Sequence, residues 1–338
     1  MDFDILIDEH FVGLCHRGDL SPIDNKYVLS IINDYEDERW RYKKFQNFIW
    51  DNIAETALSH SERQCLINQF HSMLTAAAQN LRLTDKEGDI GKGSELAEIV
   101  LYGIMKHHYN ALPVVPKIFY KQNAQDNAKG ADCVHITIQD GDFALWFGEA
   151  KFYKSIEDSR LSSIISSVGN SLNTEKLKKE NSIITNISDL HGLIDDPELK
   201  KEIQSALSYR NSIDNLKHKI HIPILILHEC EITRNSMQLD DEYKQSIIKY
   251  HTERANSYFE KQISAIGNIS KYSDVKFHII LFPVPQKSFI VDKFIQNVEH
   301  YMYRSSYHLT PASNRCLVYA TLVLTSFGIN FRPFLNML

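Results

Sequence analysis

The feature that most constrains this chain is an acidic residue at the start of one strand pattern, followed by a Glu-x-Lys motif at the end of the next. Asp132 heads the strand-like run 132–138, and an apolar run then ends at Glu149-Ala150-Lys151. Because alternate side chains of a strand point to the same face, Glu149 and Lys151 are expected to lie together. Pairing of the two strands would bring Asp132 beside them.

Two carboxylates beside an ammonium group are suited to phosphodiester chemistry. Carboxylate oxygens bind Mg²⁺, which activates water and stabilises negative charge near a phosphate. The sequence therefore predicts a metal-dependent site that cleaves nucleic acid. Similar tripeptides elsewhere lack this context: the one at 198–200 falls in a helix pattern, and no acidic residue heads a strand before the one at 274–276.

A helix with two further carboxylates precedes these strands. Ser94 is a reasonable N-cap, and apolar residues recur with helical period over 96–104. Glu95 lies in the first turn, where it suits the helix dipole, so Glu98 is the better candidate for a carboxylate near the metal. The Gly-Lys-Gly-Ser stretch at 91–94 is not a phosphate-binding P-loop, because a glycine separates its lysine from its serine.

These elements resemble the αβββαβ core of the PD-(D/E)xK nuclease superfamily: a helix with Glu98, a strand over 114–120, a strand with Asp132, a strand ending at Lys151, and a helix. More narrowly, three stretches look like the HamA family, the nuclease subunits of the Hachiman anti-phage defence system. They are the Gly-Ser-Glu-Leu-Ala-Glu-Ile helix, the Lys-Gly-Ala-Asp turn and the Leu-Trp-Phe-Gly-Glu-Ala-Lys strand. The resemblance covers about the middle third of the chain at the level of motifs.

The resemblance implies a role for each residue. Asp132 and Glu149 bind a divalent metal, Mg²⁺ with Mn²⁺ as an alternative, and the backbone carbonyl of Ala150 is a third ligand. Lys151 orients the attacking water or neutralises the phosphate. Glu98 is the fourth catalytic and metal-binding candidate, although the resemblance leaves the choice between the two helix glutamates open.

The resemblance also implies a partner, a HamB-like superfamily 2 helicase subunit that loads on DNA and restrains the nuclease until activation. The net charge of −6 agrees with help from a partner, since non-specific DNA binding depends on lysine and arginine. Local basic stretches, at 176–179 and 200–219, are the other candidate source of DNA contact.

The rest of the chain predicts an α/β protein with a mixed sheet flanked by helices. Helix patterns at 156–186 and 240–266 alternate with strand patterns at 221–227 and 275–284. We expect a helical N-terminal region over 1–88 that serves as partner interface, a nuclease-like domain over 89–305, and a C-terminal tail over 306–338 with no assigned role.

Composition predicts the compartment. The chain has 338 residues and 43% hydrophobic content, enough for a folded core. Its five cysteines form no paired C-x-x-C motif, which disfavours disulfides and zinc and favours a reducing cytoplasm. The N-terminus lacks the features of a signal peptide, and the apolar segment at 316–327 is too short for a membrane span. We therefore expect a cytoplasmic protein without a membrane partner.

The sequence thus predicts a Mg²⁺-dependent DNA endonuclease or nickase, the effector of a two-component anti-phage complex with a helicase. A restriction or junction-resolving nuclease is the nearest enzyme alternative. A catalytically inactive nuclease-like subunit that docks DNA or regulates a partner is the alternative from another class. The complete set of Asp132, Glu149 and Lys151 disfavours that last reading.

Overall fold

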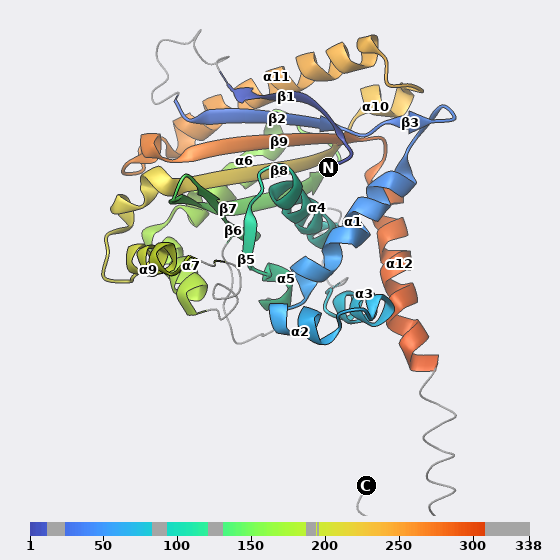
Figure 1. The fold of residues 1–338 in the computed structure, drawn as a ribbon. Coiled ribbons are helices and arrows are strands. Elements are labelled where there is room, and N and C mark those ends of the chain that lie inside the picture. Colours follow the sequence, from blue (N-terminus) through green and yellow to red (C-terminus); the bar gives the residue numbers. More distant parts are fainter. Residues whose placement is uncertain (12–23, 83–92, 121–130, 187–193, 195, 308–338) are drawn as a thin grey trace, which may run out of the picture.

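The computed structural model describes residues 1–11, 24–82, 93–120, 131–186, 194 and 196–307 (Figure 1). The boundary predicted at 84–92 and nearly all of the tail at 306–338 lie outside these described residues.

A seven-stranded mixed sheet forms the centre of the protein (Figure 1). In spatial order its strands are β1 (Asp4–His10), β2 (Lys26–Ile32), β9 (Lys276–Val284), β8 (Ile220–Glu229), β7 (Asp142–Tyr153), β6 (Cys133–Gln139) and β5 (Leu112–Val115). Strands β2, β9, β8 and β7 run parallel to one another, whereas β1, β6 and β5 pair antiparallel with their neighbours. A separate small hairpin, β3 (Tyr35–Glu36) and β4 (Arg39–Trp40), follows β2.

The residues of the strands account for this arrangement. Strands β8 and β9 are mostly apolar and almost wholly buried, as central strands covered on both faces require. Strands β6 and β7 form a hairpin closed by Asp140 and Gly141, whose φ angles of +52° and +76° suit a two-residue turn. This turn sets the register that pairs Cys133 with Gly148, and it places Asp132 beside the second half of β7.

Helices cover both faces of the sheet. One face packs against α1 (Tyr42–Ala57), α3 (Phe70–Gln79), α4 (Ser94–His107) and α12 (Lys287–Tyr307). The other packs against α6 (Asp158–Ser171), α7 (Thr174–Asn186), α9 (Pro197–Ala206) and α11 (Asp241–Ile266). Alternate residues of one strand serve the two cores: Leu225 packs with the first group and Ile224 with the second.

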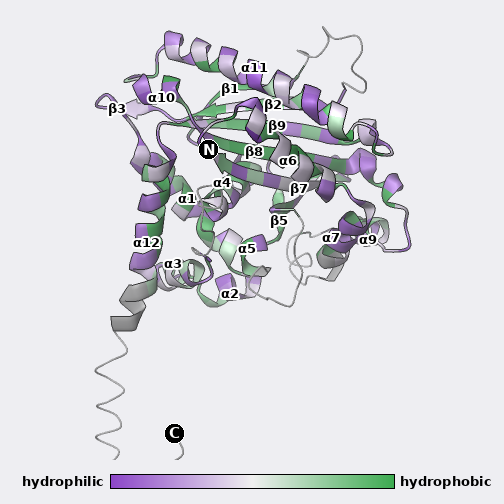
Figure 2. Ribbon diagram, turned by 180° about the vertical axis from the view of Figure 1, so that it is seen from behind, coloured by the Kyte–Doolittle hydropathy of each residue, from purple (hydrophilic) through white to green (hydrophobic). Residues whose placement is uncertain are grey.

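Shorter elements join these layers. They are α2 (His60–Cys65), α5 (Lys117–Tyr120), α10 (Glu231–Asn235) and the single-turn 3₁₀ helices Ile213–Asn215, Lys217–Lys219 and Tyr272–Asp274. Figure 2 shows hydrophobic residues concentrated in the strands, while the outer helix α11 is predominantly hydrophilic.

The predicted class, a mixed sheet flanked by helices, is confirmed. The finer prediction, an αβββαβ core, is interrupted in the structure: α5 lies between β5 and β6, and α7 and α9 lie between α6 and β8. The strand predicted over 114–120 ends at Val115, because Pro116 lacks the N–H that a ladder needs and α5 begins directly after it. Gly93, with φ of +87°, holds the N-cap position predicted for Ser94.

The prediction of a helical N-terminal region is wrong for its first part. Helices begin only at Tyr42, and the residues before them form β1 to β4. Strand β2 pairs in parallel with β9. Val28 of β2 lies opposite Ile279 of β9, some 250 residues later in the chain. This long-range pairing stabilises a strand whose local pattern is too short to identify it.

Candidate active site

Asp132 lies directly before β6, beside the second half of β7. Its N–H donates to the carbonyl of Gly148 (2.7 Å), and its carboxylate Oδ2 accepts the N–H of Ala150 (3.1 Å). The side chain therefore occupies the ladder position that a longer β6 would fill. Because the N–H and C=O of one strand residue point to the same side, the Ala150 carbonyl faces this same end of β6.

The ammonium group of Lys151 stands between two carboxylates. Its Nζ lies 3.4 Å from Oε2 of Glu149 and 3.6 Å from Oδ2 of Asp132. The two-residue period of β7 brings Glu149 and Lys151 to one face, and the β6–β7 hairpin brings Asp132 to them. The Glu149 side chain is only 4% exposed and that of Lys151 is 31% exposed, so solvent reaches the group from the lysine side.

The charges of these three residues act on one another. Burial, and then the negative charge of Asp132, raise the pKa of the Glu149 carboxyl, although Lys151 and two serine hydroxyls oppose the shift. Burial lowers the pKa of Lys151, but Asp132 and Glu149 outweigh it and the net shift is upward. Lys151 is therefore a cation at neutral pH.

Gly148 allows three elements to meet at this place. A Cβ atom at this position would lie 2.4 Å from Sγ of Cys133 on β6 and 2.8 Å from Cδ2 of Leu101 on α4. Such distances are shorter than any normal contact, so the glycine before Glu149 is required for the close packing that holds Asp132 against β7.

Two serines of α6 complete the surroundings of Glu149. Ser167 donates its hydroxyl to Oε2 (2.9 Å), and Ser171 donates to Oε1 (2.8 Å). The sequence analysis did not identify these serines. The available signal is their spacing of four residues, which also includes Ser163, whose hydroxyl bonds that of Tyr153 on β7.

The two glutamates of α4 have different surroundings. Glu95 accepts the N–H of Arg82 with both carboxylate oxygens (2.9 and 3.0 Å), so it ties α4 to the segment after α3. Glu98 is 6% exposed, and its charge acts on the Cys133 thiol, next to Asp132 in the chain. Within the described residues, no three His, Cys, Asp or Glu side chains gather closely enough to hold a metal ion. The structure thus brings Asp132 and Glu149 together and leaves Glu98 outside that pair.

The donors around Lys151 fit a divalent cation of the oxygen-binding kind. The negative charge of Asp132 raises the pKa of the neighbouring Glu149 carboxyl, and a bound cation would relieve this repulsion. Asp132, Glu149 and the carbonyl of Ala150 offer oxygens only, which suits Mg²⁺ or Mn²⁺ rather than zinc.

A buried ion pair lies near this site. Lys117 of α5 donates to both carboxylate oxygens of Glu180 on α7, at 2.8 and 2.6 Å, and the two side chains are 2% and 7% exposed. Lys117 also acts electrostatically on the thiol of Cys133. The pair therefore links α5 to α7.

The basic stretches proposed for DNA contact are only partly available. Lys217 is 2% exposed and pairs with Asp214 (2.9 Å), and Lys219 pairs with Asp142. Lys178 lies over the ring of Tyr209, 4.7 Å from its centroid. Lys217 and Lys219, the last two lysines of the segment 200–219, are therefore engaged in ion pairs within the fold.

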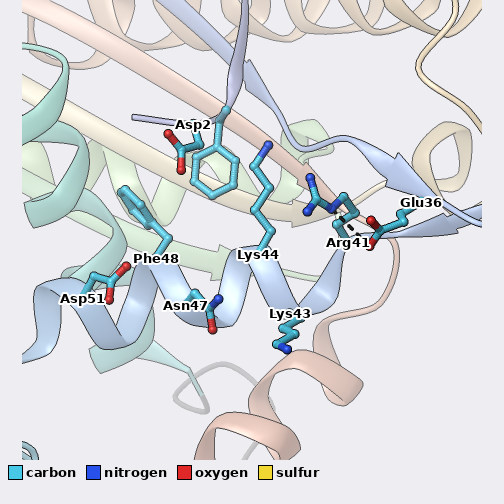
Figure 3. A pocket seen from close by; sticks show the side chains of 9 residues that line it. Asp2, Glu36, Arg41, Lys43, Lys44, Asn47, Phe48 and Asp51 are labelled. Carbon is cyan, nitrogen blue, oxygen red and sulfur yellow. Dashed lines mark ion pairs between the residues drawn. The ribbon is translucent and has the colours of Figure 1, made fainter.

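A cavity of about 630 Å³ lies elsewhere, at the start of α1 (Figure 3). Its charged lining residues are Asp2, Glu36, Arg41, Lys43, Lys44 and Asp51. Arg41 forms an ion pair with Glu36 (3.6 Å). Its charges are mixed, and none of Asp132, Glu149 and Lys151 lines it.

The end of β8 and the residue after it, His228-Glu229-Cys230, contribute to the core, since His228 and Cys230 are buried. His228 and His251 are both fully buried, with their Nε2 atoms 3.1 Å apart, and Nδ1 of His251 bonds the hydroxyl of Ser30 (2.7 Å). Burial lowers the pKa of His228 to about 4, so it is neutral at physiological pH.

Fold and site together define a class: an α/β protein in which paired strands of a mixed sheet bring two carboxylates and a lysine to one place. The HamA family model matches residues 8–298, so the chain belongs to the HamA family. Membership identifies it as a protein of the Hachiman anti-phage defence system. The curated proteins include no match to it. Among the described residues, no helix has the length and apolar character needed to cross a membrane.

Proposed function

We propose that this protein is a Mg²⁺-dependent DNA endonuclease or nickase of the PD-(D/E)xK type that acts with a helicase subunit in anti-phage defence. The observation that carries the proposal is the convergence of the Asp132 and Glu149 carboxylates on the Lys151 ammonium across two paired strands. Family membership supports the defence role.

Each residue of the proposed site has a separate role. Asp132 and Glu149 would hold the metal with the Ala150 carbonyl, and a bound Mg²⁺ would supply stabilisation of the negative charge that develops at the phosphate. Lys151, kept protonated by its two carboxylate neighbours, is suited to neutralise the phosphate or orient water rather than to accept a proton. Glu98 is the fourth candidate, on the strength of its burial close to Cys133.

The helicase partner would supply much of the affinity for DNA. The chain carries a net charge of −6, and three of the lysines considered for DNA contact, Lys201, Lys217 and Lys219, are engaged in ion pairs. Non-specific DNA affinity rests on free cationic side chains, so a partner already loaded on DNA offsets this deficit.

Plasmid cleavage with Mg²⁺ tests the proposal. Wild type, Glu149→Ala and Lys151→Ala are compared alone and with the helicase and ATP, and Glu198→Ala, from the Glu-x-Lys sequence in α9, is the matched control. We expect nicking or cleavage by the wild type and the control only. Dependence on the helicase would support restraint by the partner.

Other outcomes point to the alternatives. Cleavage that survives in both site variants, or no cleavage under any condition, favours a nuclease-like subunit that docks DNA. Cleavage that needs a specific sequence or a branched substrate, without the helicase, favours a restriction or junction-resolving nuclease.

A further inference from the structure

Two serine hydroxyls of α6 fix the orientation of the Glu149 carboxylate in the proposed site. Each carboxylate oxygen receives one hydroxyl, Oε2 from Ser167 (2.9 Å) and Oε1 from Ser171 (2.8 Å). A carboxylate that accepts one bond at each oxygen is fixed in the rotation of its plane as well as in its position.

The helix itself is held firmly. Residues four apart lie on one face of a helix, so Ser167 and Ser171 point together toward β7. Ile164 and Val168, from the same region of α6, are fully buried in the core beneath the sheet. The position of the two hydroxyls is therefore set by packing that does not depend on the site.

The hydrogen bonds to Glu149 leave one acceptor position for a metal, on Oε1. Every carboxylate oxygen has two lone-pair positions, and the serines use one on each oxygen. Lys151 approaches Oε2 from the side of Asp132, at 3.4 Å. Oε2 therefore accepts from both Ser167 and Lys151, whereas Oε1 accepts from Ser171 and has a second lone-pair position for a metal.

The choice of serine matters for charge. A hydroxyl is a neutral donor, so it satisfies the buried carboxylate without cancelling its negative charge. A lysine or arginine at either position would make the group of Asp132, Glu149 and Lys151 neutral. With serines, two carboxylates face one ammonium, and the group keeps the net negative charge that attracts a divalent cation.

We propose that Ser167 and Ser171 are positioning residues that orient Glu149 for divalent metal binding. This inference rests on the proposed metal-dependent function. It differs from a merely structural role for the serines, in which their hydroxyls would only satisfy a buried carboxylate and their loss would alter stability without altering metal affinity.

Direct Mn²⁺ binding to the full chain, measured by titration calorimetry, tests the inference without any need for activity. Loss of a group that orients a metal ligand typically costs about 10-fold to 100-fold in affinity, and we expect a weakening in that range for Ser167→Ala combined with Ser171→Ala. Ser167→Thr keeps the hydroxyl, so it should bind Mn²⁺ nearly as tightly as the wild type. Ser166→Ala is the matched control, because its hydroxyl donates to the Ser162 carbonyl of the same helix.

The single variant Ser167→Ala guards against misfolding, since Ser167 is less buried than Ser171; it too should weaken Mn²⁺ binding. Unchanged Mn²⁺ affinity in folded serine variants, with affinity lost in Glu149→Gln, would overturn the positioning role and leave the proposed nuclease standing. Equal Mn²⁺ binding by wild type and Glu149→Gln would overturn both.

Discussion

Replacing Gly148 by alanine tests whether the close approach of three elements builds the site. The new Cβ would lie 2.4 Å from Sγ of Cys133, 2.8 Å from Cδ2 of Leu101 and 3.2 Å from Cγ of Pro223. These neighbours belong to β6, α4 and β8, so no single side-chain rotation relieves all three contacts. Forcing extra atoms into a packed core costs about 1–3 kcal/mol, and we expect Gly148→Ala to lower the free energy of unfolding by that amount.

Urea unfolding of single and double variants measures the effect. Cys133→Ala removes the nearest obstructing atom, so adding it to Gly148→Ala should recover part of the loss, with a coupling energy of about 0.5–3 kcal/mol. Gly141→Ala is the control: a Cβ there meets nothing within 4 Å, its φ of +76° makes any cost one of backbone strain, and it should not couple to Cys133. A Gly148→Ala variant as stable as the wild type, or strict additivity with Cys133→Ala, would refute the reasoning.

Two further predictions concern buried cations. Lys117→Met should cost about 3–5 kcal/mol in urea unfolding, because it strands the buried Glu180 carboxylate, while Lys117→Met with Glu180→Gln should cost less; equal losses would contradict this. Burial lowers the pKa of Lys26 from its ordinary 10.5 to about 7, although Asp24 opposes the shift. The unfolded chain then binds one more proton between these values, so Lys26 makes the free energy of unfolding rise with pH by about 1.4 kcal/mol per unit from pH 7 to 10.5. Lys26→Met should remove that slope in urea unfolding measured across this range, and an unchanged slope would exclude the assignment.

Local sequence patterns are enough to predict that Asp132, Glu149 and Lys151 lie together. The two-residue period of β7 alone puts Glu149 and Lys151 on one face, and a short turn at Asp140 and Gly141 sets the register that adds Asp132. The sequence also predicts helices α4 and α11 and strands β8 and β9, because their residue patterns extend over many positions.

Other features depend on contacts between distant parts of the chain. Strand β2 owes its conformation to β9, which the first 88 residues do not reveal, so a helical N-terminal region was the wrong expectation. Ser167 and Ser171 reach Glu149 only because α6 packs against β7. Serines four residues apart are common on helix surfaces, so their spacing by itself does not indicate a role.

The most direct test of the central claim is anomalous diffraction from crystals of the full chain soaked in Mn²⁺. The account predicts an anomalous peak between the carboxylates of Asp132 and Glu149, beside the carbonyl of Ala150, and no such peak in Glu149→Gln. Wild-type crystals with no Mn²⁺ at that place, or with Mn²⁺ bound only to other residues, would contradict it.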